Sequence, residues 1–178
     1  RQRYFLHVGM FQPRKNHVNL IRAFQLLPRA LRENYSLVMV GNYGWGCGRV
    51  VKEVRRMEGE KEARWLQGVD EKDLIALYQG CAAFVFPSLF EGFGFPVLEA
   101  FASRVPVITS NTSSLPEVSG DAALLIDPEN FREIAEAMSQ VVSNNTLREQ
   151  LVSRGAMRAS LFTWEKAAAE TLAVYRKL

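Results

Sequence analysis

Short apolar runs that alternate with longer amphipathic runs are the feature that most constrains how this chain folds. The apolar runs hold about four to seven residues, end at glycine, proline or polar residues, and occupy residues 4–9, 35–41, 63–69, 82–88, 105–110 and 122–128. Runs of this length and composition predict buried strands of a parallel sheet.

Most segments between and after these runs carry apolar residues at a helical period. We predict helices over residues 16–28, 48–60, 70–81, 96–103, 130–143, 146–163 and 164–178, with Asp70 as the N-cap of the third. Strands and helices in alternation predict a single α/β domain, a Rossmann-like parallel sheet flanked by helices, with right-handed crossovers. Ligands of such sheets bind beyond the carboxyl ends of the strands, which directs attention to the loops after the first and fourth strands.

Composition and charge exclude several classes of protein. Of the 178 residues, 48% are hydrophobic and 23% are charged, and the net charge of +3 is spread along the chain rather than gathered into a nucleic-acid-binding arm. No apolar run approaches the roughly 20 residues that span a bilayer, and Cys47 and Cys81 lack metal-ligand spacing. The sequence therefore predicts a reduced, cytoplasmic protein. It starts without Met, inside the first predicted strand, and we expect it to be part of a longer protein.

The loop after the first strand places two cations side by side. It reads VGMFQPRKN, with Gly9 at the strand end, and Arg14 and Lys15 just before a helix that we expect Asn16 to cap. A helix N-terminus is already partly positive, so adjacent cations there favour a bound anion such as phosphate; a solvated basic turn is the alternative. The loop has neither the GxGxxG nor the GxxxxGK[ST] pattern, which argues against dehydrogenases and P-loop NTPases.

The loop after the fourth strand, LFEGFGFPVLEA, combines glycines, aromatic residues and two carboxylates. Gly92 and Gly94 leave backbone amides uncovered ahead of a helix whose first position suits Pro96, and such amides form an anion site. We place Glu99 in the first helical turn and Glu91 in the loop, where carboxylates accept hydrogen bonds from hydroxyls of ribose and hexose. Taken alone, each carboxylate fits a surface residue equally well; together with the basic turn they predict a sugar-nucleotide site.

These residues carry a resemblance to a known family. The segments VGMFQPRKN, FVFPSLFEGFGFPVLEAFASRVPVITS, PEVSGDAALLIDP and FTWEKAAAETLAVY resemble the C-terminal, donor-binding domain of the family 4 retaining glycosyltransferases (group 1 glycosyl transferases), which have the GT-B fold. The resemblance extends from Phe5 to Tyr175, includes the E-x7-E signature at Glu91 and Glu99, and is closest to mannosyltransferase-like members. It implies retaining, metal-independent transfer of a hexosyl group from a nucleotide-diphosphate sugar, with GDP-mannose favoured over a UDP- or ADP-sugar.

The resemblance also implies roles for individual residues. Arg14, Lys15 and Glu91 are implied as catalytic residues, because the two cations neutralise the departing diphosphate and Glu91 binds sugar hydroxyls. The implied donor-binding residues are Gly9, Arg14, Lys15, Gln67, Val69, Ser88, Leu89, Glu91, Gly92, Phe93, Gly94, Phe95 and Glu99. Among these, Glu99 is assigned to the ribose and residues 67–69 to the base. The resemblance implies no metal and no cofactor other than the donor itself.

The resemblance covers only one half of a GT-B enzyme, whose active site lies between two domains. Residues 1–178 are expected to be the nucleotide-sugar (donor) binding domain, without the N-terminal acceptor domain, and to bind donor without transferring it. The full protein is expected to reach a carbohydrate or lipid-linked acceptor through the other domain, at the inner face of a membrane and without nucleic acid. The alternatives are a nucleotide-sugar binding module or another GT-B enzyme, such as a nucleotide-sugar epimerase.

Several other residues are interpreted as structural. His7, inside the first strand, is expected to be a core histidine with satisfied hydrogen bonds, and no partner is expected for His17. The last predicted helix is amphipathic, and its apolar side is expected to contact the absent domain. The aromatic residues that we expect in the core are Trp65, Phe84, Phe86 and Trp164.

Overall fold

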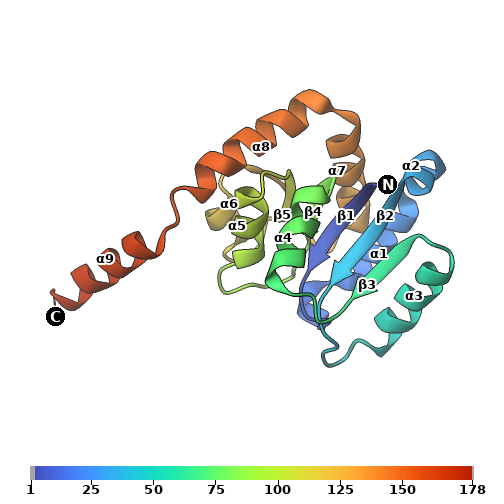
Figure 1. Cartoon of the computed structure of the whole chain (residues 1–178), viewed down its shortest axis with the longest axis horizontal. Helices are drawn as coiled ribbons and strands as arrows, with labels where there is room; N and C mark the ends of the chain where they lie inside the picture. The colour runs from blue at the N-terminus through green and yellow to red at the C-terminus, as the bar shows by residue number, and fades with distance from the viewer. Residues whose placement is uncertain (1–2, 178) are drawn as a thin grey trace.

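A parallel sheet organises residues 3–177, the part of the chain that the computed structural model describes. Within this part, six strands lie in the order β3-β2-β1-β4-β5-β6, and every neighbouring pair is parallel (Figure 1). The strands are β1 (Arg3–Val8), β2 (Tyr35–Val40), β3 (Ala63–Leu66), β4 (Ala83–Phe86), β5 (Val107–Ser110) and β6 (Ala123–Ile126). The prediction of a Rossmann-like parallel sheet flanked by helices is confirmed.

Helices connect the strands and cover both faces of the sheet (Figure 1). They are η1 (Pro13–Lys15, a 3-10 turn), α1 (His17–Leu26), α2 (Arg29–Asn34), α3 (Gly48–Gly59), α4 (Glu71–Gly80), α5 (Phe95–Ala102), α6 (Leu115–Ser119), α7 (Phe131–Ser143), α8 (Asn145–Ala159) and α9 (Trp164–Tyr175). Parallel strands cannot be joined by hairpins, so each connection crosses a face of the sheet. Among residues 3–177, no helix combines the length and the apolar character needed to cross a membrane.

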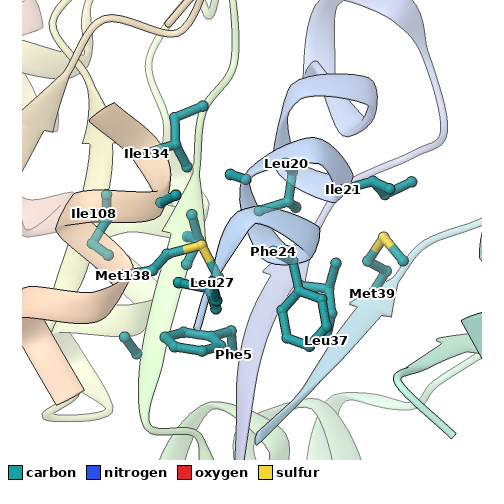
Figure 2. Close-up of a cluster of buried hydrophobic side chains, with 14 of the residues drawn as sticks. Phe5, Leu20, Ile21, Phe24, Leu27, Leu37, Met39, Ile108, Ile134 and Met138 are labelled. Atoms are coloured by element: carbon teal, nitrogen blue, oxygen red, sulfur yellow. The ribbon is translucent and has the colours of Figure 1, made fainter. Parts of the chain in front are cut away.

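The two faces of the sheet carry separate hydrophobic cores. On one face, Phe5 and Leu37 of the strands pack against Phe24 of α1 and against α7, as Figure 2 shows. On the other face, Leu6 and Phe84 pack against α4, α5 and α6. Consecutive strand residues therefore serve opposite cores, because side chains alternate across a strand. Each of these fully buried side chains contributes about 1.5–3 kcal/mol to stability.

The direction in which strands are added to the sheet reverses between β1 and β4. These two strands are neighbours in the sheet although β2 and β3 separate them in the sequence. From β1 the chain proceeds outward through β2 to β3, and from β4 it proceeds outward the other way through β5 to β6. Sheets of this type bind ligands beyond the carboxyl ends of the strands at the point of reversal. The two loops selected from the sequence follow β1 and β4, so they lie at this point.

Two short α-helices, α2 and α6, were not predicted from the sequence, nor was the 3-10 turn η1. The helix predicted over residues 16–28 is α1, which ends at Leu26. Pro28 does not end it but is the N-cap of α2. Helix α6 has Pro116 in its first turn, but its five residues are too few to display a helical period. The predicted cap of α4 is confirmed, since the Asp70 carboxylate accepts a hydrogen bond from the Asp73 amide at 2.8 Å.

Trp164 does not lie in the core, and that prediction is wrong. The residue is 78% exposed at the start of α9, which stands away from the rest of the chain (Figure 1). Within the described residues, α9 has no buried side chain, so its apolar positions show a helical period without forming part of a core. The other predictions hold better: Phe84 and Phe86 are fully buried, and Trp65 is half-buried.

Helices α5 and α8 approach each other closely at Gly155. A Cβ atom at this position would lie 2.6 Å from Cδ1 of Phe101, which is fully buried on α5. Because real Cβ contacts are longer, a larger residue at position 155 forces the two helices apart or moves the Phe101 ring. This contact fixes where α8 runs, and with it the start of the connection to α9.

We therefore expect Gly155→Ala to lower the free energy of unfolding by up to about 2 kcal/mol. Overpacking costs about 1–3 kcal/mol, whereas alanine gains at most about 1 kcal/mol over glycine in a helix. Gly59→Ala is the matched control, since a Cβ there meets no atom within 4 Å, and its stability should be unchanged or slightly higher. Urea unfolding followed by circular dichroism measures both. Equal stability of Gly155→Ala and wild type would show that α5 and α8 pack less closely.

Candidate functional site

The loop after β1 forms a tight turn that is bonded to two other loops. Pro13–Lys15 is a 3-10 turn, and Asn16 follows it in the left-handed region at a φ of 59°. The Asn16 side chain donates hydrogen bonds to the carbonyl oxygens of Pro87 at 3.0 Å and Pro128 at 2.7 Å. Asn16 is the N-cap residue of α1, as predicted by position, but its side chain does not cap the helix. It instead connects the loops that follow β1, β4 and β6.

Arg14, Lys15 and Glu91 form an ion cluster at the carboxyl ends of β1 and β4. Nζ of Lys15 lies 2.7 Å from Oε1 of Glu91, and Nη1 of Arg14 lies 2.7 Å from Oε2. Lys15 and Glu91 are buried, whereas Arg14 is exposed. The structure thus brings together the three residues that the sequence singled out as catalytic. The anion that lies between the two cations in this structure is the carboxylate of Glu91.

The surroundings of Glu91 favour its charged form. Burial alone raises the pKa of a carboxyl, but hydrogen bonds and charge from Lys15, with a hydrogen bond from Arg14, outweigh it and lower the Glu91 pKa. The Lys15 ammonium also lies 4.8 Å from the centroid of the Phe86 ring, close enough for a cation–π contact. The Glu91 carboxylate is therefore ionised at neutral pH.

The glycine-containing loop after β4 is held at its start and leaves its amides free. The Leu89 amide donates to the Arg14 carbonyl at 2.8 Å, and the Ser114 hydroxyl donates to the carbonyl oxygens of Glu91 and Phe93 at 3.0 and 2.9 Å. Among residues 3–177, no acceptor takes a hydrogen bond from the backbone amides of residues 92–95. Free amides at a helix start suit an anion.

Gly94 is required by the shape of this loop. Its φ of 107° is one that residues with a side chain rarely adopt, and a Cβ would lie 2.7 Å from Leu115. Helix α5 begins at Phe95, one residue earlier than predicted, so Pro96 takes the second position instead of the first. Glu99 consequently lies beyond the first turn, and its predicted place there is wrong. The first residue of a helix is uncertain by one position when either of two adjacent residues suits the helix start.

Glu99 is an exposed carboxylate that a buried tyrosine orients. The Tyr78 hydroxyl, from α4, donates a hydrogen bond of 2.8 Å to Oε2 of Glu99. Burial, followed by the charge of Glu99, raises the pKa of Tyr78, so the phenol stays protonated and remains a donor. The sequence showed Tyr78 only as part of an apolar helix face, and no motif identified it as a partner of Glu99.

The remaining predicted residues lie at the same edge of the sheet with different surroundings. Ser88 is buried and its Oγ has no hydrogen-bond partner among residues 3–177, whereas Leu89 is exposed. Gln67 and Val69 follow β3, which is separated from β1 by β2. No hydrogen bond or ion pair within residues 3–177 joins their side chains to the ion cluster. Gly9 lies beneath Lys15, since a Cβ at position 9 would lie 3.3 Å from the lysine methylenes.

A pair of neutral histidines lies buried near Lys15. The His7 ring centroid is 4.7 Å from that of His17, which also stacks on Phe11 at 4.2 Å. Nδ1 of His7 is 2.9 Å from the Val85 carbonyl and must carry the proton, which leaves Nε2 as an acceptor without a donor. The prediction that His7 is a satisfied core histidine is therefore right about burial and wrong about its second nitrogen. His17 is buried too, and its Nε2 also lacks a partner.

Three comparisons with known proteins show the family and the fold of the chain. A family model described as "Glycosyl transferases group 1" matches residues 1–158. The O-antigen chain mannosyltransferase B of Escherichia coli is 40% identical over 177 residues, which are 99% of this chain and 46% of that protein. The serotype-specific mannosyltransferase WbdA of Escherichia coli is 32% identical over 169 residues, 93% of this chain and 20% of that protein. The chain thus spans less than half the length of these relatives.

Solved structures share the fold. The sucrose-phosphate synthase from Thermosynechococcus elongatus aligns with a TM-score of 0.83 and 25% identity over 99% of this chain and 45% of that one. The alpha,alpha-trehalose 6-phosphate synthase from Burkholderia multivorans aligns with a TM-score of 0.88 and 17% identity over 99% of this chain and 43% of that one. The identity in the second case supports the fold alone.

The buried histidines predict a loss of stability in mild acid. Burial lowers the pKa of His7 to about 4 and that of His17 to about 2, from 6.5. Between pH 6.5 and these values the unfolded chain binds protons that the folded chain excludes, so stability falls as the pH falls. We expect a loss of about 2 kcal/mol per histidine between pH 7 and pH 5, at about 1.4 kcal/mol per pH unit below 6.5.

Urea unfolding at several pH values measures this loss. His17→Phe keeps an aromatic ring against Phe11 and removes one titrating group, so it should show about half of the loss seen in wild type. Glu91 does not confuse the result, because its lowered pKa places its own contribution below pH 4.5. A stability that stays flat from pH 7 to pH 5 would contradict the burial of two neutral imidazoles.

Proposed function

The chain belongs to the group 1 glycosyl transferases, and from that premise we propose that its carboxyl edge binds a sugar carried on a nucleoside diphosphate. The observation that carries this proposal is the ion cluster. Two cations, Arg14 and Lys15, are held by one carboxylate directly beside the free amides of residues 92–95. This combination of positive charge and unused donors suits a diphosphate.

A bound diphosphate competes with Glu91 for the two cations. Its oxygens carry more negative charge than one carboxylate, and guanidinium and ammonium groups both bind phosphate well. When Arg14 and Lys15 turn to the diphosphate, the Glu91 carboxylate is released in part and can accept hydrogen bonds from hydroxyls of the attached sugar. In this proposal Glu91 holds the two cations in place before the donor binds, and afterwards its carboxylate accepts hydrogen bonds from the sugar hydroxyls.

The same two cations support the chemistry of transfer. The bond between the sugar carbon and the phosphate oxygen breaks, and a bond to the acceptor oxygen forms. The nucleoside diphosphate leaves with the bonding electrons, and the proton of the acceptor hydroxyl passes to an oxygen of the departing phosphate. Preorganised positive charge stabilises the negative charge that develops on the departing oxygen. We further propose that the transfer retains the anomeric configuration and uses no metal ion. Within residues 3–177 no group of three or more His, Cys, Asp or Glu side chains is placed to hold a metal.

We assign the ribose of the donor to Glu99. Its carboxylate is exposed, and Oε2 accepts a hydrogen bond from the buried phenol of Tyr78. This hydrogen bond fixes the direction of the carboxylate. A fixed carboxylate can accept hydrogen bonds from two adjacent hydroxyls, which a ribose provides. Residues 67–69, at the end of β3, are proposed to border the base.

The donor that we favour is GDP-mannose, with UDP- and ADP-sugars as alternatives. The support comes from relatives that are named mannosyltransferases, at 40% and 32% identity. The acceptor is proposed to be a carbohydrate or a lipid-linked glycan. Since the chain spans 46% of the first of these relatives, we propose that acceptor binding and transfer need the rest of the protein. Free, buried cysteines suit a reducing compartment, and we propose action in the cytoplasm.

Binding of GDP, UDP and ADP to the 178-residue chain tests the proposal, with heats measured by calorimetry and stability by melting. We expect one of the three to bind and to raise the melting temperature, because a ligand of the folded state alone stabilises it. Glu99→Ala should weaken that binding by about 1–3 kcal/mol, the cost of losing hydrogen bonds to a charged group. Glu149→Ala, an exposed carboxylate on α8, is the matched control and should bind as wild type does. Failure of all three nucleotides to bind wild type would overturn the proposal.

Substitutions in the ion cluster test the phosphate role separately. Lys15→Ala should weaken binding of the nucleoside diphosphate by roughly tenfold or more and leave binding of the nucleoside nearly unchanged. Glu91→Gln should bind the diphosphate at least as tightly as wild type, because the competing carboxylate charge is gone. Calorimetric titrations of each variant with nucleoside and with diphosphate give the comparison. Equal losses for nucleoside and diphosphate in Lys15→Ala would refute a phosphate contact.

A further inference from the structure

A chain of aromatic side chains connects the glycine-containing loop to the start of α9. The rings of Phe93 and Phe95 lie 4.8 Å apart between centroids. Phe93 meets Phe162 edge to face at 6.0 Å, and Phe95 stacks with Trp164 at 6.2 Å. Phe162 lies in the connection between α8 and α9, and Trp164 is the first residue of α9. Two residues from each segment thus form one aromatic cluster, which we name the aromatic bracket.

Arg158 ties the bracket to α6 on the other side of the loop. Its guanidinium lies 5.1 Å from the Phe162 ring centroid, and its Nε donates to the Val118 carbonyl at 3.0 Å. Helix α6 begins after Ser114, whose hydroxyl bonds the carbonyl oxygens of Glu91 and Phe93. The contacts therefore close a ring that runs from the loop through α6 and Arg158 to Phe162 and back to Phe93.

The exposure of these side chains argues against a role as ordinary core. Phe95 and Trp164 are 52% and 78% exposed, and Phe93 is 36% exposed. Aromatic pairs of this kind contribute about 0.5–1.5 kcal/mol each, far less than a buried core residue. Contacts this weak scarcely hold the fold, but they suffice to bias the conformation of a short loop. The neighbouring Leu161 is 51% exposed and takes no part in the bracket.

We propose that Phe162 and Trp164 are positioning residues that hold the amides of residues 92–95 in the conformation that receives the diphosphate. The inference rests on the proposed function, because it assumes that a diphosphate binds at these amides. Phe93 and Phe95 lie within that segment, so their packing partners restrict its backbone. Linkage is reciprocal: if the bracket favours the bound loop, a bound diphosphate favours the formed bracket. The segment that leads into α9 then senses whether the donor site is occupied.

Tryptophan fluorescence and calorimetry on the 178-residue chain test this inference. The probe is whichever of GDP, UDP and ADP binds wild type. We expect binding to change the emission of wild type, and the change to be smaller in Trp164→Phe, which keeps a stacking ring and removes one of the three tryptophans, the others being Trp45 and Trp65. Phe162→Ala should raise the Kd of the diphosphate by three- to tenfold, and Phe162→Tyr should restore it. Leu161→Ala is the matched control and should bind as wild type does.

The outcomes separate this inference from the proposed function. Binding to wild type with an unchanged Kd in Phe162→Ala, and an emission change in Trp164→Phe as large as in wild type, overturns the bracket and leaves the donor site standing. Lack of binding to wild type overturns both. A Phe162→Ala protein that melts as wild type does without ligand, and still binds less tightly, supports positioning over a structural role, because loss of fold would lower both. Rescue by Phe162→Tyr supports it independently.

Discussion

The arrangement of this edge of the molecule depends on one buried carboxylate that binds two cations from another loop. Glu91 and Lys15 are both buried, so removing either leaves a charge in a site with little water, at a cost of about 3–5 kcal/mol. Arg14 is exposed and adds less. The pair holds the loops after β1 and β4 together, and the Asn16 side chain extends this connection to the loop after β6. The same contacts thus position the charged side chains and the loop backbones at the point where the direction of strand addition reverses.

The two buried histidines near Lys15 are uncharged, and this matters for the ion cluster. His7 and His17 are neutral because burial opposes their protonation, and a proton on either would add positive charge near Lys15. Within the described residues, the buried side-chain atoms without a partner are Nε2 of both histidines and Oγ of Ser88. Each unmet hydrogen bond costs about 1–3 kcal/mol. Such costs are tolerated mainly near functional sites, which agrees with the position of these three atoms.

The sequence predicted the sheet because strands buried on both faces leave a clear apolar signal, and it located both loops because glycine, proline and charge mark strand ends. It missed α6, which is too short for a period, and it placed Trp164 in a core because a helical pattern does not reveal whether a partner surface exists. It brought Arg14, Lys15 and Glu91 to one edge but gave no sign that they bind each other. Tyr78 could not be identified either, since its bond to Glu99 joins helices that only the fold brings together.

The same features explain why donor binding and transfer separate in this chain under the proposed function. The chain supplies charge for a departing diphosphate, amides for its oxygens and carboxylates for hydroxyls, all on one edge of the sheet. What it lacks among residues 3–177 is an uncommitted base beside Glu91, since the nearby histidines are buried and neutral and Glu91 is held by two cations. Under the proposed function, the leaving group has several partners on this edge. The exposed rings of Phe95, at the start of α5, and Trp164, at the start of α9, stack on each other beside this edge.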